Sequence, residues 1–324
     1  MIDNYTKLLF IGNHRLGDSI LSTGIYNYFA QNYSNLQATV VCGSVAEPIF
    51  SAAPFTKEVI TLRKKKFGLH WLKIWSLTKD IKWNIIVDLR NSLVSRVLSK
   101  ENYFLYNQDY KNSHRVIYLS STINKEQSPL DPIIWITPEA EKKAQDVLSK
   151  IYNKQKIIAF APVTNWKRKE WPIHNFIDLA RMLINKNSPM NNAKILLLGG
   201  PGERERVKEI VFALGKENIL NLTAELDILS VAAILKKCNI FIGNDSGLMH
   251  LSAAVGIPTI GLFGPSKDEL YAPWGKNAKV IRTKESYKEL VEHKNYNKNE
   301  ETSLINSIDP QKVYTACISL LKNL

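Results

Sequence analysis

The stretch that decides the fold is residues 239–266, which read NIFIGNDSGLMHLSAAVGIPTIGLFGPS. Two short apolar runs flank a polar turn, Asn244 to Gly247, and a short helical segment. Apolar runs of strand length bounded by glycine are typical of a parallel sheet covered by helices on both faces. The stretch therefore predicts strand, turn, helix and strand in a protein of the α/β class.

The turn also has the composition of an anion site. A helix that begins directly after a parallel strand points free N–H groups and its positive dipole end at the carboxyl edge of the sheet. We expect Asp245 to cap this helix, and we expect the amides near Ser246 and Gly247 to face a phosphate. Singly, these residue types are more often helix caps, and His250 is more often a core residue. Together with residues 264–266 after the next strand, they favour a site.

The chain has 324 residues, so two domains are expected. Strand-like and helix-like segments alternate in both halves. We predict Rossmann-like, doubly wound parallel-sheet domains at residues 1–152 and 153–324, facing a cleft where ligands bind. The expected strands lie at residues 7–12, 37–42, 59–62, 85–89, 156–160 and 194–199, with helices near 93–100 and 203–214 and a closing helix at 308–321 that could pack back on the first domain.

Charge and cysteine usage narrow the class of protein. A formal net charge of +13 favours a polyanionic partner: nucleic acid, acidic lipid headgroups or a phosphorylated substrate. No nucleic-acid-binding module is visible, so nucleic acid is the least favoured of these. Cys42, Cys238 and Cys317 form no CxxC pair, so neither a disulfide framework nor a zinc site is predicted. No apolar run approaches the ~20 residues of a membrane span, and we expect a cytoplasmic protein.

The first turn of the chain, residues 12–18, reads GNHRLGD. It lacks the GxGxxG order of a dinucleotide fold and the GK[ST] ending of a P-loop. Its glycines allow a sharp turn that places Asp18 at the start of a helix, at the carboxyl edge of the first sheet. Asp18 is predicted to be either a helix cap or a general base.

Four motifs in both halves of the chain are similar to those of the family 9 glycosyltransferases, the ADP-heptose:lipopolysaccharide heptosyltransferases and their relatives. They are RLGDSILST at 15–23, WKRKEWP at 166–172, GGPGERE at 199–205 and the stretch from Gly243 to Ser266, in the family's order. The resemblance implies a GT-B fold and inverting transfer without a metal or cofactor. It also implies a nucleotide-sugar donor, ADP-heptose above all.

The resemblance carries site roles to individual positions. Asp18 matches the base that deprotonates the acceptor hydroxyl. The implied donor residues are Thr164 and Asn165 after a strand, Lys169 on the phosphates, Glu203 on the ribose, Asp245 on the sugar hydroxyls, and Ser246, Gly247 and His250 on the diphosphate. Two departures, Gly24 and Leu248, stand where relatives often have proline. They concern local backbone shape.

The acceptor is implied to be a lipid-linked saccharide held by the first domain. Candidate contacts are Arg15, Arg63, Lys64 and Arg90. The segment from residue 63 to 82 combines Lys and Arg with Trp71 and Trp75, which suits the anionic inner face of a membrane. An ordinary amphipathic helix with its tryptophans in the core is the alternative. We therefore expect a peripheral protein at the inner membrane.

Three functions remain open from the sequence. The first is transfer of a sugar, most simply heptose, to a lipid A–core acceptor. The second is another GT-B nucleotide-sugar enzyme: an epimerase, a hydrolase or a transferase of a different hexose. The third is a sugar-nucleotide-binding protein without catalysis. Retention of both Asp18 and the Asp245 turn favours the first.

Overall fold

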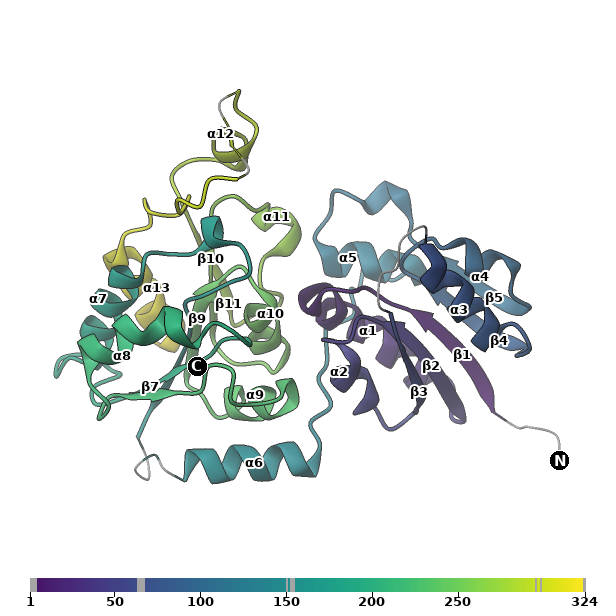
Figure 1. Cartoon of the computed structure of the whole chain (residues 1–324), viewed down its shortest axis with the longest axis horizontal. Coiled ribbons are helices and arrows are strands. Elements are labelled where there is room, and N and C mark those ends of the chain that lie inside the picture. The colour runs from purple at the N-terminus through teal and green to yellow at the C-terminus, as the bar shows by residue number, and fades with distance from the viewer. Residues whose placement is uncertain are drawn as a thin grey trace. The chain divides into compact units, whose positions relative to one another are not determined.

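A computed structural model describes residues 5–62, 68–149, 151, 155–294, 296–297 and 299–322. The chain divides into two compact units, Met1–Trp135 and Ile136–Leu324, each of which carries its own sheet (Figure 1). This division precedes helix α6 (Pro138–Leu148), whereas the sequence analysis set the domain boundary after residue 152. Helix α6 packs against α9 (Ile228–Leu235) of the second unit.

The sheet of the first unit has the strand order β3-β2-β1-β4-β5, and all its pairs are parallel. Its strands are β1 (Thr6–Ile11), β2 (Leu36–Cys42), β3 (Thr56–Thr61), β4 (Trp83–Asp88) and β5 (Lys100–Leu105). Its helices are α1 (Leu16–Asn32), α2 (Glu47–Ser51), α3 (Leu69–Thr78), α4 (Leu93–Val97) and α5 (Arg115–Ser120). The predicted doubly wound arrangement of this half is confirmed.

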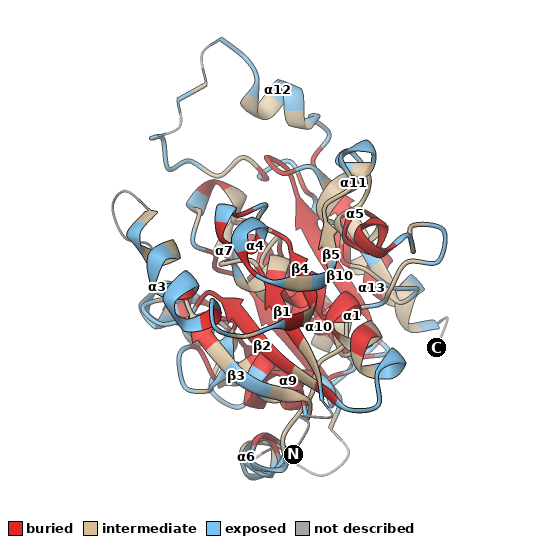
Figure 2. Ribbon diagram, turned by 90° about the vertical axis from the view of Figure 1, so that its right-hand side faces the viewer, coloured by how far each residue is buried: buried red, intermediate tan, exposed pale blue. Residues whose placement is uncertain are grey.

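Successive residues of β1 serve opposite faces of the first sheet. Leu9 and Ile11 belong to a core that also contains Ile74 of α3 and Val94 of α4. Phe10 instead contacts the rings of α1 and α2, since Tyr26 and Phe50 lie against it. Strands that are buried on both faces show as continuous red in Figure 2. This explains why β1 reads as an uninterrupted apolar run.

The segment after α5 explains Gly24. Its backbone crosses α1, where Thr23 Oγ1 accepts a hydrogen bond from the Ile133 N–H at 2.9 Å. A Cβ atom at position 24 would collide with the carbonyl oxygen of Leu130. The close approach of two backbones therefore requires glycine at this departure from the family pattern.

The second unit contains the sheet β11-β10-β9-β6-β7-β8, also with parallel pairs throughout. Its strands are β6 (Ile157–Ala161), β7 (Lys194–Leu197), β8 (Ile219–Asn221), β9 (Ile240–Asn244), β10 (Thr259–Phe263) and β11 (Ala278–Arg282). Its remaining helices are α7 (Ile173–Ile184), α8 (Lys208–Leu214), α10 (Gly247–Ala254), α11 (Asp268–Tyr271), α12 (Tyr287–Val291) and α13 (Pro310–Lys322). The strand, turn, helix and strand predicted for residues 239–266 are β9, α10 and β10.

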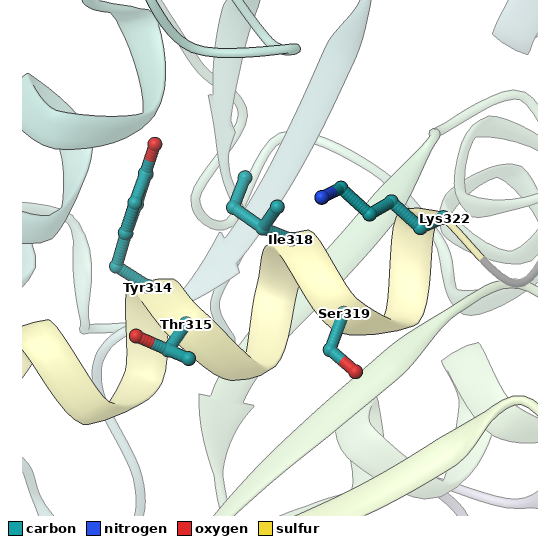
Figure 3. Close-up of a pocket in the computed structure, with 5 residues that line it drawn as sticks. All are labelled: Tyr314, Thr315, Ile318, Ser319 and Lys322. Atoms are coloured by element: carbon teal, nitrogen blue, oxygen red, sulfur yellow. The ribbon is translucent and has the colours of Figure 1, made fainter.

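The closing helix α13 packs within its own unit, against α7 and β11. Val313, Ala316 and Cys317 supply its part of the core. The outer side of α13 borders a hollow of about 420 Å³, where Tyr314, Ile318 and Lys322 follow one another along the helix (Figure 3). None of the predicted site residues lines this hollow.

Some elements differ from the sequence expectation. The helix predicted at residues 93–100 ends at Val97, and strand β5 begins at Lys100. The helix predicted at 203–214 is a 3₁₀ turn, Arg204–Val207, followed by α8. Strands β5, β8 and β11 were not predicted, because they are partly exposed and carry polar residues instead of an apolar run. No helix in the described part of the chain is long and apolar enough to cross a bilayer.

Candidate functional site

In each of the two sheets, the order in which successive strands are added reverses direction once. The first unit does so between β1 and β4, and the second between β6 and β9. At such a point the loops after the two strands turn to opposite sides and leave a crevice at the carboxyl edge. The predicted donor residues follow three neighbouring strands there: Thr164 and Asn165 after β6, Glu203 after β7, and Asp245 after β9.

An ion pair joins two of these loops across the reversal point. Lys169 Nζ lies 2.5 Å from Asp245 Oδ2, and the two side chains are 24% and 10% exposed. The prediction that Asp245 caps α10 is wrong, because Ser246 occupies the N-cap position and makes no side-chain cap. Asp245 orients Lys169 instead. The ammonium is thereby fixed beside the turn that precedes α10.

Asn244, the last residue of β9, is hydrogen-bonded to the loop that follows β6. It is fully buried, its Oδ1 accepts the Trp171 N–H at 3.0 Å, and its Nδ2 donates to the Pro162 carbonyl at 2.8 Å. Trp171 is itself buried and donates from Nε1 to the Ile308 carbonyl at 2.9 Å. One amide side chain thus fixes both ends of the loop that carries Lys169.

Helix α10 begins at Gly247, directly after β9, so its first N–H groups face the carboxyl edge. The hydroxyls of Ser246 and Ser266 are buried there, and neither has a hydrogen-bond partner among the described residues. Ser266 follows β10, the neighbour of β9. His250 lies one turn into α10 and is 4% exposed, as a core histidine would be. The edge therefore offers amides and two hydroxyls to an anion.

A hollow of about 660 Å³ opens beside these loops. Thr164, Asn165 and Glu203 line it, together with residues 166–168, 201, 202, 206 and 299–301. Lys169, Asp245, Ser246, Gly247 and His250 do not belong to its lining. A volume of this size suits a small ligand such as a nucleotide. The predicted donor residues therefore form two groups: Thr164, Asn165 and Glu203 line the hollow, and the others lie at the α10 turn or pair with it.

Two residues that the sequence analysis missed fix the wall of this hollow. Glu170 accepts the Thr164 N–H at 2.7 Å and both its oxygens lie 2.5 Å from Arg206 Nη2. Arg206 Nη1 also donates to the Thr164 carbonyl at 3.1 Å. Burial raises the pKa of Glu170, although the Thr164 N–H and the Arg206 charge lower it in part. Their positions inside the WKRKEWP and GGPGERE motifs were the available signal.

Glu203 is held by its own loop. Its Oε2 accepts the Gly200 N–H at 2.7 Å, which fixes the turn after β7. A segment from the end of the chain closes the other side, because the Leu304 N–H donates to the Arg168 carbonyl at 2.9 Å and Lys167 pairs with Glu301 at 2.8 Å. The hollow is therefore built from three stretches that lie far apart in sequence, residues 164–168, 201–206 and 299–301.

Asp18 lies in the first turn of α1, after β1 of the first unit, where a carboxylate is favoured by the helix dipole. The N-cap of α1 is Arg15, so the cap role considered for Asp18 is wrong. Asp18 Oδ1 lies 3.7 Å from Arg115 Nε, and each side chain is 19% exposed. Asp18 is thus paired with a cation at the carboxyl edge.

Arg115, missed by the sequence analysis, is fixed by two aromatic rings. Its guanidinium lies 5.0 Å and 5.1 Å from the ring centroids of Tyr106 and Tyr118, and its Nη2 donates to Tyr106 Oη at 2.8 Å. Burial raises the pKa of Tyr106 to about 12, although the Arg115 charge lowers it in part. Because β5 was not predicted, the strand end that leads to Tyr106 gave no signal.

Two of the four predicted acceptor residues, Arg15 and Arg90, lie within the described part of the chain. Arg15 is exposed at the start of α1. Arg90 follows β4 and is partly buried, with its guanidinium 5.8 Å from the Trp71 ring centroid. Arg63 and Lys64 lie outside the described residues. The first unit therefore brings Asp18 and Arg90 to the same edge of its sheet, after neighbouring strands.

A comparison with models of known protein families matches most of the chain, including the loops that carry the predicted donor residues. The family model described as glycosyltransferase family 9 (heptosyltransferase) matches residues 74–300, more than half of the chain. The chain belongs to glycosyltransferase family 9. The matched range contains every predicted donor residue, whereas Asp18 precedes it. The predicted resemblance is confirmed.

Individual family 9 proteins match over nearly the whole chain. Lipopolysaccharide heptosyltransferase 2 of Salmonella typhimurium is 25% identical, covering 97% of this chain and 98% of the relative. The structure of the Escherichia coli ADP-heptose lps heptosyltransferase II aligns with a TM-score of 0.76 at 22% identity over 98% and 99% of the two chains. The family 9 glycosyltransferase of Veillonella parvula aligns at 0.79, with 21% identity, over 100% and 99%. These likenesses show that the fold is GT-B, as predicted.

Proposed function

We propose that this family 9 glycosyltransferase transfers heptose from ADP-heptose to a lipid-linked inner-core saccharide. The observation that carries the proposal is the convergence of Thr164, Asn165, Glu203, Lys169 and Asp245 on the ends of β6, β7 and β9. The named donor of the E. coli relative and the named lipopolysaccharide role of the Salmonella relative support the two substrates.

The donor residues fit the stabilisation of a leaving diphosphate. Negative charge grows on the diphosphate as the bond to the anomeric carbon breaks, and fixed dipoles with a cation lower the energy of that charge. The α10 amides, the hydroxyls of Ser246 and Ser266, and Lys169 supply these groups. We propose that they act without a metal or cofactor, that the nucleoside occupies the hollow beside Glu203, and that Asp245 binds sugar hydroxyls.

Asp18 fits the role of general base. Inversion needs a carboxylate that takes the proton of the acceptor hydroxyl on the face opposite to the leaving group. Arg115 Nε lies 3.7 Å from Asp18 Oδ1 and pairs with this carboxylate. Arg15, Arg90, Arg63 and Lys64 would contact the anionic acceptor, and the protein would act at the cytoplasmic face of the inner membrane as a peripheral protein.

The test is incubation of the purified protein with ADP-heptose, and in parallel with UDP- and GDP-sugars, each with a deacylated core acceptor. We expect an acceptor that gains one heptose in the ADP-heptose reaction only, detected by mass. Transfer from another donor would replace the substrate assignment. Turnover of the donor without any acceptor product would support an epimerase or hydrolase.

A further inference from the structure

Two helices of the first unit expose large apolar side chains to solvent. On α3, Leu72 is 62% and Trp75 40% exposed, and on α4, Leu93 is 77% and Val97 70% exposed. Helices α3 and α4 pack against each other, and Figure 2 shows both largely in the colour of exposed residues. We call the exposed residues of these helices, together with the adjoining Lys79, the α3–α4 surface: Leu69, Leu72, Lys73, Trp75, Ser76, Leu77, Lys79, Leu93, Arg96 and Val97.

These apolar side chains are not needed by the core of the unit. Helix α3 packs inward through Ile74 and Thr78, which are buried, and through Trp71. Ile74 and Thr78 are four residues apart and therefore share the inner face of the helix. At about 100° per residue, Leu69 and Leu72 lie on the opposite face. A surface helix ordinarily carries polar residues there. Several large apolar residues gathered on neighbouring helices indicate a surface that meets an apolar phase.

The charges around this surface indicate which phase. The sequences of α3 and α4 contain no Asp or Glu, and Lys73, Arg96 and the adjoining Lys79 are cationic and exposed. The exposed Asp80 next to Lys79 leaves this group with an excess of positive charge. Lys79 Nζ lies 4.9 Å from the Trp75 ring centroid. In the sequence, the cationic run from Arg63 to Lys66 also precedes α3. Apolar side chains surrounded by Lys, Arg and Trp match the interface of an anionic bilayer.

The same charges disfavour a second copy of the chain as the occupant. A twofold contact through this surface would set the cationic surface of one copy, with Lys73, Lys79 and Arg96, against the same cationic surface of the other. Like charges brought together at an interface oppose association. A bilayer instead offers anionic headgroups to the cations and acyl chains to the leucines.

We propose that the α3–α4 surface docks the first unit onto anionic phospholipid, with the leucines entering the headgroup and acyl boundary. This proposal rests on the proposed function in one respect: a lipid-linked acceptor would be embedded in the membrane to which the α3–α4 surface binds. Arg90, beside Trp71 of α3, continues the cationic surface toward the carboxyl edge that holds Asp18. Docking would thus bring a membrane-bound acceptor close to its base.

The experiment measures binding to vesicles by flotation, using phosphatidylcholine alone and phosphatidylcholine with phosphatidylglycerol. The variants are L72S/L93S, which removes apolar contacts, and K73E/K79E, which reverses charge. The matched controls lie in the second unit: F212S, at a phenylalanine that is 93% exposed, and K236E/K237E, at two exposed lysines. All four substitute exposed side chains, and thermal unfolding checks that each variant folds.

We expect the wild-type protein to bind the mixed vesicles and both surface variants to bind them about tenfold or more weakly. The controls should bind like wild type. High salt should weaken wild-type binding and reduce the deficit of K73E/K79E, since salt screens exposed charges. Unchanged binding by both surface variants, or no binding by wild type, would overturn the docking surface. A dimer that L72S/L93S dissociates would replace the bilayer by a second copy.

Transfer to a deacylated acceptor separates this inference from the proposed function. The surface variants should transfer heptose to the soluble acceptor at the wild-type rate but lose activity on an acceptor embedded in vesicles. Vesicle binding without any heptose transfer would leave the docking surface standing and remove the proposed substrate. Soluble transfer with unaffected vesicle binding in the variants would remove the docking surface alone.

Discussion

The two units use the same winding but stabilise their edges differently. In the second unit, Asn244 ties β9 to residues 162 and 171, which follow another strand, and Lys169 pairs with Asp245 across the same crevice. In the first unit, Asp88 at the end of β4 accepts bonds from its own loop: the N–H groups of Arg90 and Ser92 and the hydroxyls of Ser92 and Ser95. The bonds of Asn244 thus run to the loop of another strand, whereas those of Asp88 stay within the segment that follows β4, and the first unit crosses between loops through the Asp18–Arg115 pair instead.

This difference matches the demands of the two proposed substrates. A leaving diphosphate requires dipoles that are already in place when charge develops, and cross-braced loops supply them. An acceptor presented by a membrane approaches as a large, variable ligand. Its edge needs a fixed base, and Asp18 is paired with Arg115 of α5.

The largest effect should come from the acceptor edge. D18N is expected to lower the rate of heptose transfer by about 10³-fold, because an amide cannot accept the hydroxyl proton. Affinity for ADP should stay close to wild type, since the proposed donor residues lie in the other unit. Calorimetry and a mass-based transfer assay measure the two quantities. A large loss of ADP affinity would make Asp18 a structural residue.

The next effect should come from the donor edge. K169A removes the cation proposed for the leaving diphosphate and leaves Asp245 unpaired, so transfer should fall by about 10²-fold. Binding of ADP should weaken as well, in contrast to D18N. K186A is the matched control, because Lys186 is an exposed lysine after α7 that does not line the hollow. Equal losses in both variants would mean that only the overall charge of the second unit matters.

The bracing itself can be tested through stability. N244A removes two buried hydrogen bonds and leaves the Trp171 N–H and the Pro162 carbonyl unsatisfied, so we expect a loss of about 2 to 4 kcal/mol in the free energy of unfolding. N239A, at the other end of the same region, removes the bond to the Ile157 N–H from an exposed residue and should cost less. Denaturant titration compares them. Similar losses would contradict a special role for Asn244.

The smallest effect concerns the assignment of α6 to the second unit. Asp227, the N-cap of α9, accepts bonds from Ser230 and from Lys143 of α6. Burial alone would raise the pKa of Asp227, but the bonds from Lys143 and Ser230 lower it to about 2. Because the pKa is lower in the folded than in the unfolded chain, the ionised carboxylate stabilises the fold above about pH 4, and this contribution is lost as pH falls toward 2.

D227N should therefore lower the free energy of unfolding at neutral pH by about 0.5 kcal/mol, since the groups are largely solvated, and the deficit should shrink in acid. The exposed Asp146 of α6 provides the control variant, D146N. Unfolding curves at several pH values measure the difference. If D227N still lowers the free energy of unfolding at the lowest pH at which the protein stays folded, the loss comes from helix capping geometry and not from the charge of Asp227.

The sequence by itself determined the class of fold, and its resemblance to family 9 pointed to the candidate donor loops and the candidate base. Apolar runs bounded by glycine indicate buried parallel strands. Polar residues that directly follow such strands lie at the carboxyl edge of the sheet. Partly exposed strands such as β5 give no such run, so the chain between Leu98 and Arg115 could not be read. The sequence also could not tell a cap from a ligand at Asp245.

Only the tertiary structure decided which residues meet. The pairing of Asp245 with Lys169, of Asp18 with Arg115 and of Glu170 with Arg206 joins positions far apart in the chain, and no local spacing predicts such contacts. Likewise, α3 reads as an amphipathic helix with tryptophans, but only burial separates Ile74 inside from Leu72 and Trp75 outside. Local pattern indicates most of the elements, whereas packing determines which side chains are buried and which stay exposed.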